Sequence, residues 1–150
     1  MKLSVLMVAM SLIFSCALAG AADRKYIVKP RASDMKGLPF SDAVLAGNTL
    51  YIAGHIGIDP KTGVAAEKPE DEAKLVMEGV KATVEAAGLT MDDVVQLTIY
   101  CTDLKLYGTF NDVYKTYFHG DFPARAFIGV DKLVRNGRFE VEGVAVKRAQ

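Results

Sequence analysis

Apolar and polar residues alternate along several short stretches of the chain, and this period of two is typical of β-strands. The longest such stretch runs from residue 94 to 101. One face of it is expected to carry Val95, Leu97, Ile99 and Cys101, and the other face Gln96 and Thr98. Five further strands are predicted at residues 26–28, 43–46, 50–53, 124–130 and 138–146. The segment Gly47-Asn48-Thr49 indicates a hairpin turn between two of them.

Two other stretches repeat apolar residues every three or four positions, which predicts amphipathic α-helices. The first is expected at residues 70–87, because Pro69 and acidic residues stand at its start and Gly88 follows its end. The second is expected at residues 106–118. The apolar stripe of this second helix is Phe110, Val113, Tyr114 and Tyr117. We expect these aromatic side chains in the core rather than in a binding platform.

The predicted order of elements is three strands, a helix, a strand, a helix and two strands. A strand followed by a helix and another strand predicts a right-handed parallel unit, here the strands at 94–101 and 124–130. The expected fold class is therefore α+β, a mixed six-stranded sheet with two helices packed on one face.

The N-terminal segment has the layout of a secretory signal peptide. Lys2 is its only charged residue, residues 3–16 form an apolar run, and Ala17-Leu18-Ala19 ends the run with small residues. We therefore expect residues 1–21 to be removed, and residues 22–150 to form a single domain that is exported, to the periplasm in a bacterium. Two alternatives are a lipid anchor through Cys16 and an uncleaved membrane anchor.

Charge and cysteine content exclude several classes of function. The chain has 18 basic and 18 acidic residues, and loss of Lys2 with the leader leaves 17 basic residues. A nearly neutral chain has no excess positive charge to attract the nucleic-acid backbone, so we expect no nucleic-acid partner. We also expect no membrane partner once the leader is cleaved. Only Cys101 remains after cleavage, and it stands far from His55 and His119, so the sequence predicts neither a disulfide nor a metal site.

Three charged residues lie in the otherwise apolar strands near the C-terminus. Arg125 stands in the predicted strand 124–130, and Glu140 and Glu142 share one face of the strand 138–146. A guanidinium can bind a carboxylate in two-pronged geometry, and a carboxylate can take a proton from water. These residues fit a site for a small carboxylic acid. On the residue pattern alone, an internal ion pair or solvated strand charges are the simpler explanation.

The separation of Arg125 and Glu140 sets a condition on any shared site. If the last two strands formed a tight hairpin through Asn136-Gly137, Glu140 would face Leu133, eight residues from Arg125. At about 3.3 Å per residue this separation is roughly 26 Å. A common site therefore requires another strand order or two subunits.

Several segments of the chain, taken in order, resemble the Rid family, also called YjgF and named for reactive intermediate or imine deamination. The segments are LPFSDAV at 38–44, AGHIGIDPKTG at 53–63, EAAGL at 85–89, Asp103-Leu104, Phe110-Asn111, Tyr114, and Pro123-Ala124-Arg125 with a Glu-apolar-Glu strand that begins 15 residues after the arginine. The resemblance covers about residues 25–148. It implies the chorismate-mutase-like fold and a homotrimer with a cleft between each pair of subunits.

The resemblance also implies roles for individual residues. Arg125 matches the arginine that binds the substrate carboxylate, and Glu140 matches the glutamate that positions or activates the attacking water. Gly54, Asn111 and the backbone after Phe127 match positions that line the cleft. Each has a structural alternative, such as close backbone packing at Gly54 or a solvated helix residue at Asn111. For Glu142 we expect a structural ion pair.

Three positions depart from the family pattern. Phe40 stands where the imine deaminases often have tyrosine, Phe127 where many have cysteine, and His55 where glutamine is common. The resemblance still places Phe40 among the substrate-binding residues, in a cleft that we expect to be more apolar than usual. His55 is either a titrating group near the site or a hydrogen-bonded structural histidine.

The resemblance implies an enamine/imine deaminase that hydrolyses 2-iminobutanoate or 2-iminopropanoate to the 2-keto acid and ammonia, without a cofactor. Export is unusual for such an enzyme, because its usual substrates arise inside the cell. The alternatives are a non-catalytic trimer that binds small carboxylic acids, and a ribonuclease or translation inhibitor, against which the neutral charge argues.

Overall fold

The computed structural model describes residues 23–29 and 37–148. The strands are β1 (Arg24–Ile27), β2 (Ala43–Ala46), β3 (Thr49–Ile56), β4 (Val94–Cys101), β5 (Ala124–Gly129) and β6 (Phe139–Val146). The helices are α1 (Pro69–Ala86) and α2 (Tyr107–Tyr114), with 3-10 turns at Met91–Asp93, Leu104–Leu106, Lys115–Tyr117 and Val134–Asn136. The predicted signal peptide and its Cys16 lie outside the described residues.

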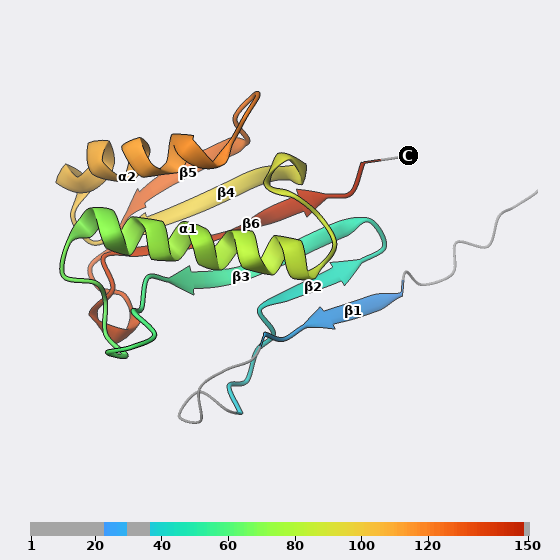
Figure 1. Ribbon diagram of the computed structural model, residues 1–150, viewed down its shortest axis with the longest axis horizontal. Helices are drawn as coiled ribbons and strands as arrows, with labels where there is room; N and C mark the ends of the chain where they lie inside the picture. The colour runs from blue at the N-terminus through green and yellow to red at the C-terminus, as the bar shows by residue number, and fades with distance from the viewer. Residues whose placement is uncertain (1–22, 30–36, 149–150) are drawn as a thin grey trace, which may run out of the picture.

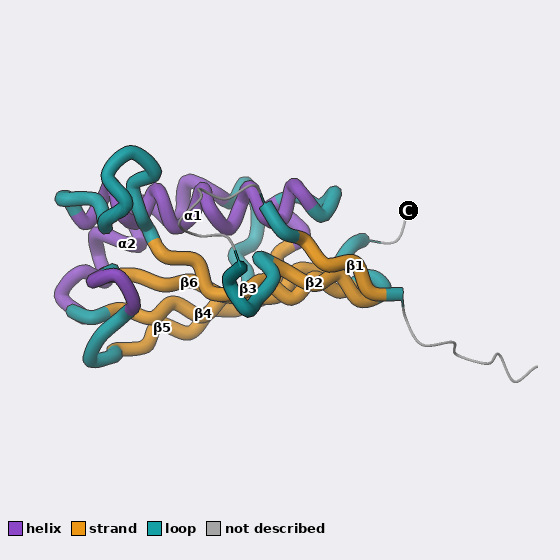
Figure 2. The backbone as a smooth tube through the Cα atoms, turned by 90° about the horizontal axis from the view of Figure 1, so that it is seen from below, coloured by secondary structure: helices purple, strands orange, loops and turns teal. Residues whose placement is uncertain are grey.

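The six strands form one mixed sheet in the order β1-β2-β3-β6-β4-β5 (Figure 1). Only β4 and β5 are parallel, as predicted from the helix between them, and the other neighbours are antiparallel. Both helices cover the same face, so the molecule has two layers (Figure 2). The predicted fold is therefore confirmed. The supposed hairpin of the last two strands does not form, because β4 lies between β5 and β6.

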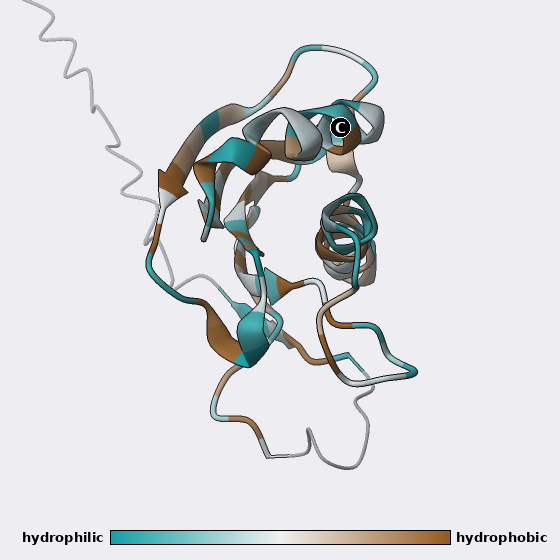
Figure 3. Ribbon diagram, turned by 90° about the vertical axis from the view of Figure 1, so that its left-hand side faces the viewer, coloured by the Kyte–Doolittle hydropathy of each residue, from teal (hydrophilic) through white to brown (hydrophobic). Residues whose placement is uncertain are grey.

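Helix α1 provides the central part of the core. Its buried apolar residues are Ala73, Val76, Met77, Val80 and Val84. They repeat at helical spacing and are fully buried. The view along the helix shows α1 lying over one face of the sheet (Figure 3). Gly88, at a φ of +81°, ends the helix in the left-handed conformation that favours glycine.

Helix α2 is shorter than predicted. The structure has a 3-10 turn at Leu104–Leu106, eight α-helical residues at Tyr107–Tyr114 and a second 3-10 turn at Lys115–Tyr117. Phe110, Val113 and Tyr114 are buried as expected, but Tyr117 is only partly buried at the edge of the core. The tighter 3-10 turn rotates the last residues away from the α-helical stripe.

The predicted face of β4 is wrong at its first residues. Val95 is 46% exposed, and Val94 is buried in its place beside Leu97, Ile99 and Cys101. The pairing of β4 with β6 shifts between Val94 and Gln96. An extra residue in a strand reverses the alternation beyond it, which a sequence pattern does not reveal.

The face of the sheet away from the helices is open and partly apolar. One row across all six strands consists of Tyr26, Val44, Tyr51, Val144, Gln96 and Ala124. Tyr26 and Tyr51 are each more than half exposed. We call this surface the open face. Among the described residues, no helix has the length and apolar content needed to cross a membrane.

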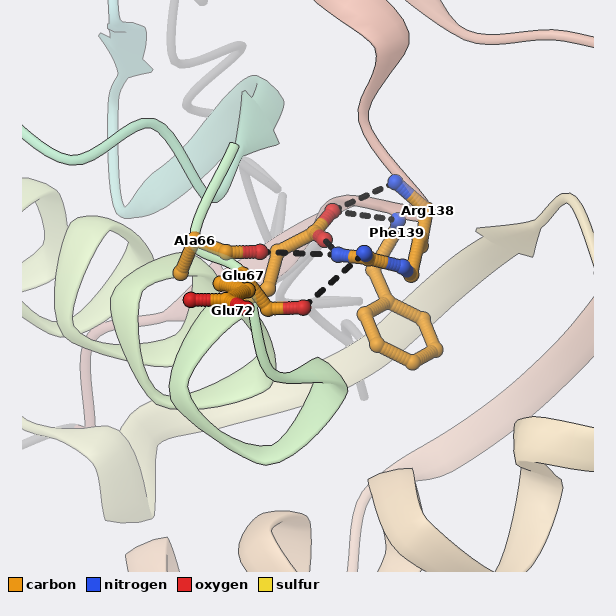
Figure 4. Close-up of polar contacts among 5 residues, drawn as sticks. All are labelled: Ala66, Glu67, Glu72, Arg138 and Phe139. Atoms are coloured by element: carbon orange, nitrogen blue, oxygen red, sulfur yellow. Dashed lines mark hydrogen bonds and ion pairs between the residues drawn. The ribbon is translucent and has the colours of Figure 1, made fainter. Parts of the chain in front are cut away.

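A buried carboxylate joins α1 to the start of β6 (Figure 4). Glu72 is fully buried, and its Oε1 accepts hydrogen bonds from the backbone N–H groups of Arg138 and Phe139. Its Oε2 accepts a charge-assisted bond from the Arg138 guanidinium. The same guanidinium donates to the carbonyl oxygens of Ala66 and Glu67, at 2.8 and 3.0 Å. These bonds fix the position at which β6 enters the sheet.

Candidate functional site

Arg125 lies on the helix-covered face of the edge strand β5, where it pairs in register with the buried Leu97. Its Nη1 donates to Asn111 Oδ1 at 2.7 Å, and its Nη2 donates to the Tyr107 hydroxyl at 3.2 Å. The guanidinium carbon lies 4.7 Å from the centre of the Tyr114 ring, a cation–π distance. Within the described part of the chain, no carboxylate forms an ion pair with Arg125. The charge is thus held in a fixed orientation by neutral groups.

Aromatic rings surround this guanidinium. Phe127 shares its face of β5, with its ring centre 5.8 Å from the guanidinium carbon. Phe127 meets Tyr107 and Phe110 edge to face, at ring distances of 5.0 and 5.7 Å. Burial raises the pKa of Tyr114 to about 12, although the nearby Arg125 acts in the opposite direction. Tyr114 therefore stays neutral, and its ring stabilises the cation without forming an ion pair.

Glu140 lies on the open face of β6, because it alternates with the buried Phe139 and Val141. It pairs in register with Ile56 of β3 and Tyr100 of β4. Its carboxylate lies over Gly54, where an added Cβ atom would be 2.9 Å from Glu140 Cδ. Gly54 thus leaves the space that the carboxylate occupies. Burial, and then the nearby negative charge of Glu142, raise the pKa of Glu140, which makes its carboxylate a stronger base toward a water molecule.

Glu142 is a hydrogen-bond acceptor rather than the expected ion-pair partner. The Tyr100 hydroxyl donates to Glu142 Oε1 at 2.8 Å, and this bond is the main cause of the raised pKa of Tyr100. No cation pairs with Glu142 among the residues for which the structure gives positions. Its charge therefore remains uncompensated next to Glu140.

Five of the six predicted site residues form two groups on opposite faces of the sheet, and the sixth, Phe40, belongs to neither. Asn111 and Phe127 lie with Arg125 on the helix side. Gly54 lies with Glu140 on the open face. Phe40 lies in the loop before β2 and is 51% exposed. The strand order differs from a hairpin, yet one protomer still does not bring Arg125 and Glu140 together.

His55 lies away from both groups and attaches β3 to α1. Its Nδ1 is 2.7 Å from the carbonyl oxygen of Ala53, and its Nε2 is 2.7 Å from Thr83 Oγ1. A shift of register between Ile52 and His55 turns this side chain to the helix side and leaves Gly54 on the open face. Of the two sequence-based interpretations, the geometry supports the structural histidine.

Sequence reasoning missed three tyrosines at the site. Tyr107 and Tyr114 contact Arg125, and Tyr100 contacts Glu142. The spacing of Tyr107, Asn111 and Tyr114 would have placed all three on one side of a helix, which is a usable signal. Among the described residues, no cluster of three or more histidine, cysteine or acidic side chains is placed to hold a metal ion.

A family model described as Endoribonuclease L-PSP matches residues 34–147. The chain belongs to this family, the Rid or YjgF family. A 2-iminobutanoate/2-iminopropanoate deaminase of Dermatophagoides farinae is 39% identical to this Rid chain over 82% of its length and 96% of the relative.

Solved structures of the family agree with the fold of this Rid chain. The YjgF gene product of Escherichia coli has a TM-score of 0.75 at 35% identity, covering 83% of this chain and 99% of that one. Escherichia coli TdcF with bound serine has a TM-score of 0.74 at 33% identity, covering 83% and 100%. The resemblance that the sequence predicts is confirmed.

Proposed function

We propose that the protein is an enamine/imine deaminase that hydrolyses 2-iminobutanoate and 2-iminopropanoate to 2-keto acids and ammonia. The observation that carries this proposal is the Arg125 guanidinium, held by Asn111 and Tyr107 and free of a carboxylate partner among the described residues. Such a group suits the carboxylate of a small acid. Relatives named as imine deaminases, and a family member with bound serine, support the same class of ligand.

The reaction requires one proton acceptor and one water molecule. Arg125 binds the carboxylate, and Glu140 takes a proton from the water as its oxygen bonds to the imine carbon. The proton passes to the nitrogen and gives a carbinolamine. Glu140 then takes the hydroxyl proton and returns it to the amino nitrogen, the carbon–nitrogen bond breaks, and ammonia leaves as the 2-keto acid forms. Imine hydrolysis mainly needs positioning and proton transfer, so this scheme uses no cofactor.

The proposal includes a homotrimer with sites between subunits. Because Arg125 and Glu140 lie on opposite faces of the sheet, the Arg125 edge of one protomer would complete a site on the open face of another. The apolar row of the open face supports such a contact. Light scattering on the chain without its leader is expected to give three times the monomer mass. A monomer at micromolar concentration would contradict both the assembly and the composite site.

The activity is tested with residues 22–150. Imino acids are generated in place from several amino acids by an amino-acid oxidase, and the appearance of keto acid is followed with and without the protein. Faster appearance supports the proposal. Binding of keto acids through Arg125 without turnover would instead indicate a carboxylic acid-binding protein. Cleavage of RNA without imine hydrolysis would favour a ribonuclease, against which the neutral charge argues.

The raised pKa of Glu140 leads to a pH prediction. Only ionised Glu140 accepts a proton, so kcat/KM falls as the pH drops through its pKa. Glu142→Gln removes a neighbouring negative charge that raises this pKa. In the pH profile of kcat/KM, the acid limb of the variant is expected at lower pH than that of the wild type. Glu85→Gln, on the exposed side of α1, is the control. An acid limb that stays in place or moves to higher pH would contradict the base role of Glu140.

We also propose that the protein is exported. This proposal rests on the composition of residues 1–21 alone. It separates the protein from the cytosolic enzymes that generate imino acids, so the physiological substrate would arise outside the cytoplasm.

A further inference from the structure

The Tyr107 hydroxyl lies beside the proposed carboxylate-binding group without completing its own hydrogen bonding. Tyr107 is the first residue of α2 and is 48% exposed. Its oxygen accepts a hydrogen bond from Arg125 Nη2 at 3.2 Å. Among the described residues, this is the only hydrogen bond of the hydroxyl group. A phenol hydroxyl can donate one hydrogen bond and accept others. The Tyr107 hydroxyl only accepts one from Arg125, so its proton is still available to a ligand.

Packing fixes where this hydroxyl lies. The Tyr107 ring meets Phe127 edge to face at 5.0 Å, and its centre is 5.5 Å from the Arg125 guanidinium carbon. Asn111, one helical turn along α2, holds the other terminal nitrogen of Arg125. Two residues of one helix thus orient the guanidinium from both of its terminal nitrogens. Each terminal nitrogen keeps a second N–H that these two bonds do not use.

We infer that Tyr107 is a further substrate-binding residue, whose hydroxyl donates to the same carboxylate that Arg125 binds. Donation from a cation to the phenol oxygen polarises its O–H bond and strengthens it as a donor. A carboxylate has two oxygens with about four acceptor positions, so it can accept from the guanidinium and the phenol together. This inference rests on the proposed function, because it takes Arg125 as the carboxylate-binding group.

A structural role for Tyr107 makes different predictions. In that case the hydroxyl would only attach the first turn of α2 to β5, and its removal would affect folding alone. A binding role acts more strongly on ligands that carry a carboxylate than on neutral amides of the same shape, because a charge-assisted hydrogen bond is stronger than a neutral one. It also acts equally on bound substrate and transition state, so it changes KM more than kcat.

The test compares Tyr107→Phe with wild type in titrations with 2-oxobutanoate and with its neutral analogue 2-oxobutanamide. The variant keeps the ring and loses only the hydroxyl. We expect binding of 2-oxobutanoate to weaken about tenfold, as for loss of one charge-assisted hydrogen bond. Binding of the amide should weaken less, because its carbonyl oxygen accepts only a neutral hydrogen bond, and KM for the imino acid should rise with kcat nearly unchanged. Tyr117→Phe, which removes a hydroxyl bonded to Glu78, is the matched control.

Two results would overturn the inference while leaving the proposed function intact. One is unchanged 2-oxobutanoate binding in folded Tyr107→Phe, whether or not its melting temperature falls, and the other is equal weakening for acid and amide. If wild type neither binds 2-oxobutanoate nor hydrolyses imino acids, the proposed function fails and the inference fails with it. Binding and turnover by the wild-type protein therefore distinguish failure of the proposed function from failure of the inference about Tyr107 alone.

Discussion

Replacing Arg125 by alanine is expected to lower kcat/KM for imine hydrolysis at least about a hundredfold. Hydrogen bonds that involve a charged group contribute roughly 1.5–3 kcal/mol each, and a factor of ten in rate corresponds to about 1.4 kcal/mol. Two bonds to a substrate carboxylate account for the expected loss. Arg125→Lys should recover little of it. An ammonium group cannot bond Asn111 and Tyr107 with two separate nitrogens while it binds a ligand.

Initial rates on the folded variants, with assembly checked by light scattering, measure this effect. Arg148→Ala is the control, because Arg148 is an exposed arginine that bonds Asp92 and Asp93 rather than the residues around Arg125. Glu140→Gln should give the complementary result, with ligand binding retained and turnover slowed, because the base is lost and the shape is kept. Wild-type rates in folded Arg125→Ala would show that the deaminase assignment of this site is wrong.

Replacing Glu72 by glutamine is expected to lower the free energy of unfolding by about 3 kcal/mol, because a buried acceptor of a charge-assisted hydrogen bond and of two backbone N–H groups is lost. The carboxylate accepts from two backbone N–H groups and from the Arg138 guanidinium. An amide at this position has one acceptor oxygen and would turn N–H groups toward other donors. The loss is large because Glu72 is fully buried, so water cannot replace the missing acceptor.

Chemical denaturation of wild type and Glu72→Gln measures this loss. Both curves are fitted with the same dependence of the free energy of unfolding on denaturant concentration. Glu70→Gln makes the same change at an exposed position of the first turn of α1, where we expect an effect within about 0.5 kcal/mol. A loss below 1 kcal/mol for Glu72→Gln would show that the buried contact does not hold β6 in place.

Helices and strands could be predicted closely because their signals are local. The stripe of α1, its Gly88 stop and the bounds of β4 follow from spacing alone. The residue that was misplaced lies where the register changes. Val95 adjoins a shift in the pairing of β4 with β6, and such a shift depends on the partner strand rather than on the local pattern.

The candidate site could be predicted only in part, for a similar reason. Strand alternation placed Glu140 and Glu142 on one face, and the structure agrees. The face of Arg125 depends on how β5 pairs with β4, which no local pattern encodes. The contacts of Tyr107 with Arg125 join two segments that meet only in the folded chain. The contacts that residues of another protomer would make cannot be predicted from the local pattern of one sequence.

The position of β6 has a consequence for the order in which the molecule can form. β6 is the last strand to be synthesised, yet it lies in the middle of the sheet between β3 and β4. Until it emerges from the ribosome, β1-β2-β3 and β4-β5 remain separate pieces without a shared strand. We therefore expect a nascent chain that stops before residue 139 to stay unfolded and to be readily digested by protease, whereas the complete chain becomes resistant. A protein of this topology stays unfolded, and can therefore pass through a translocation channel, until its synthesis is almost complete.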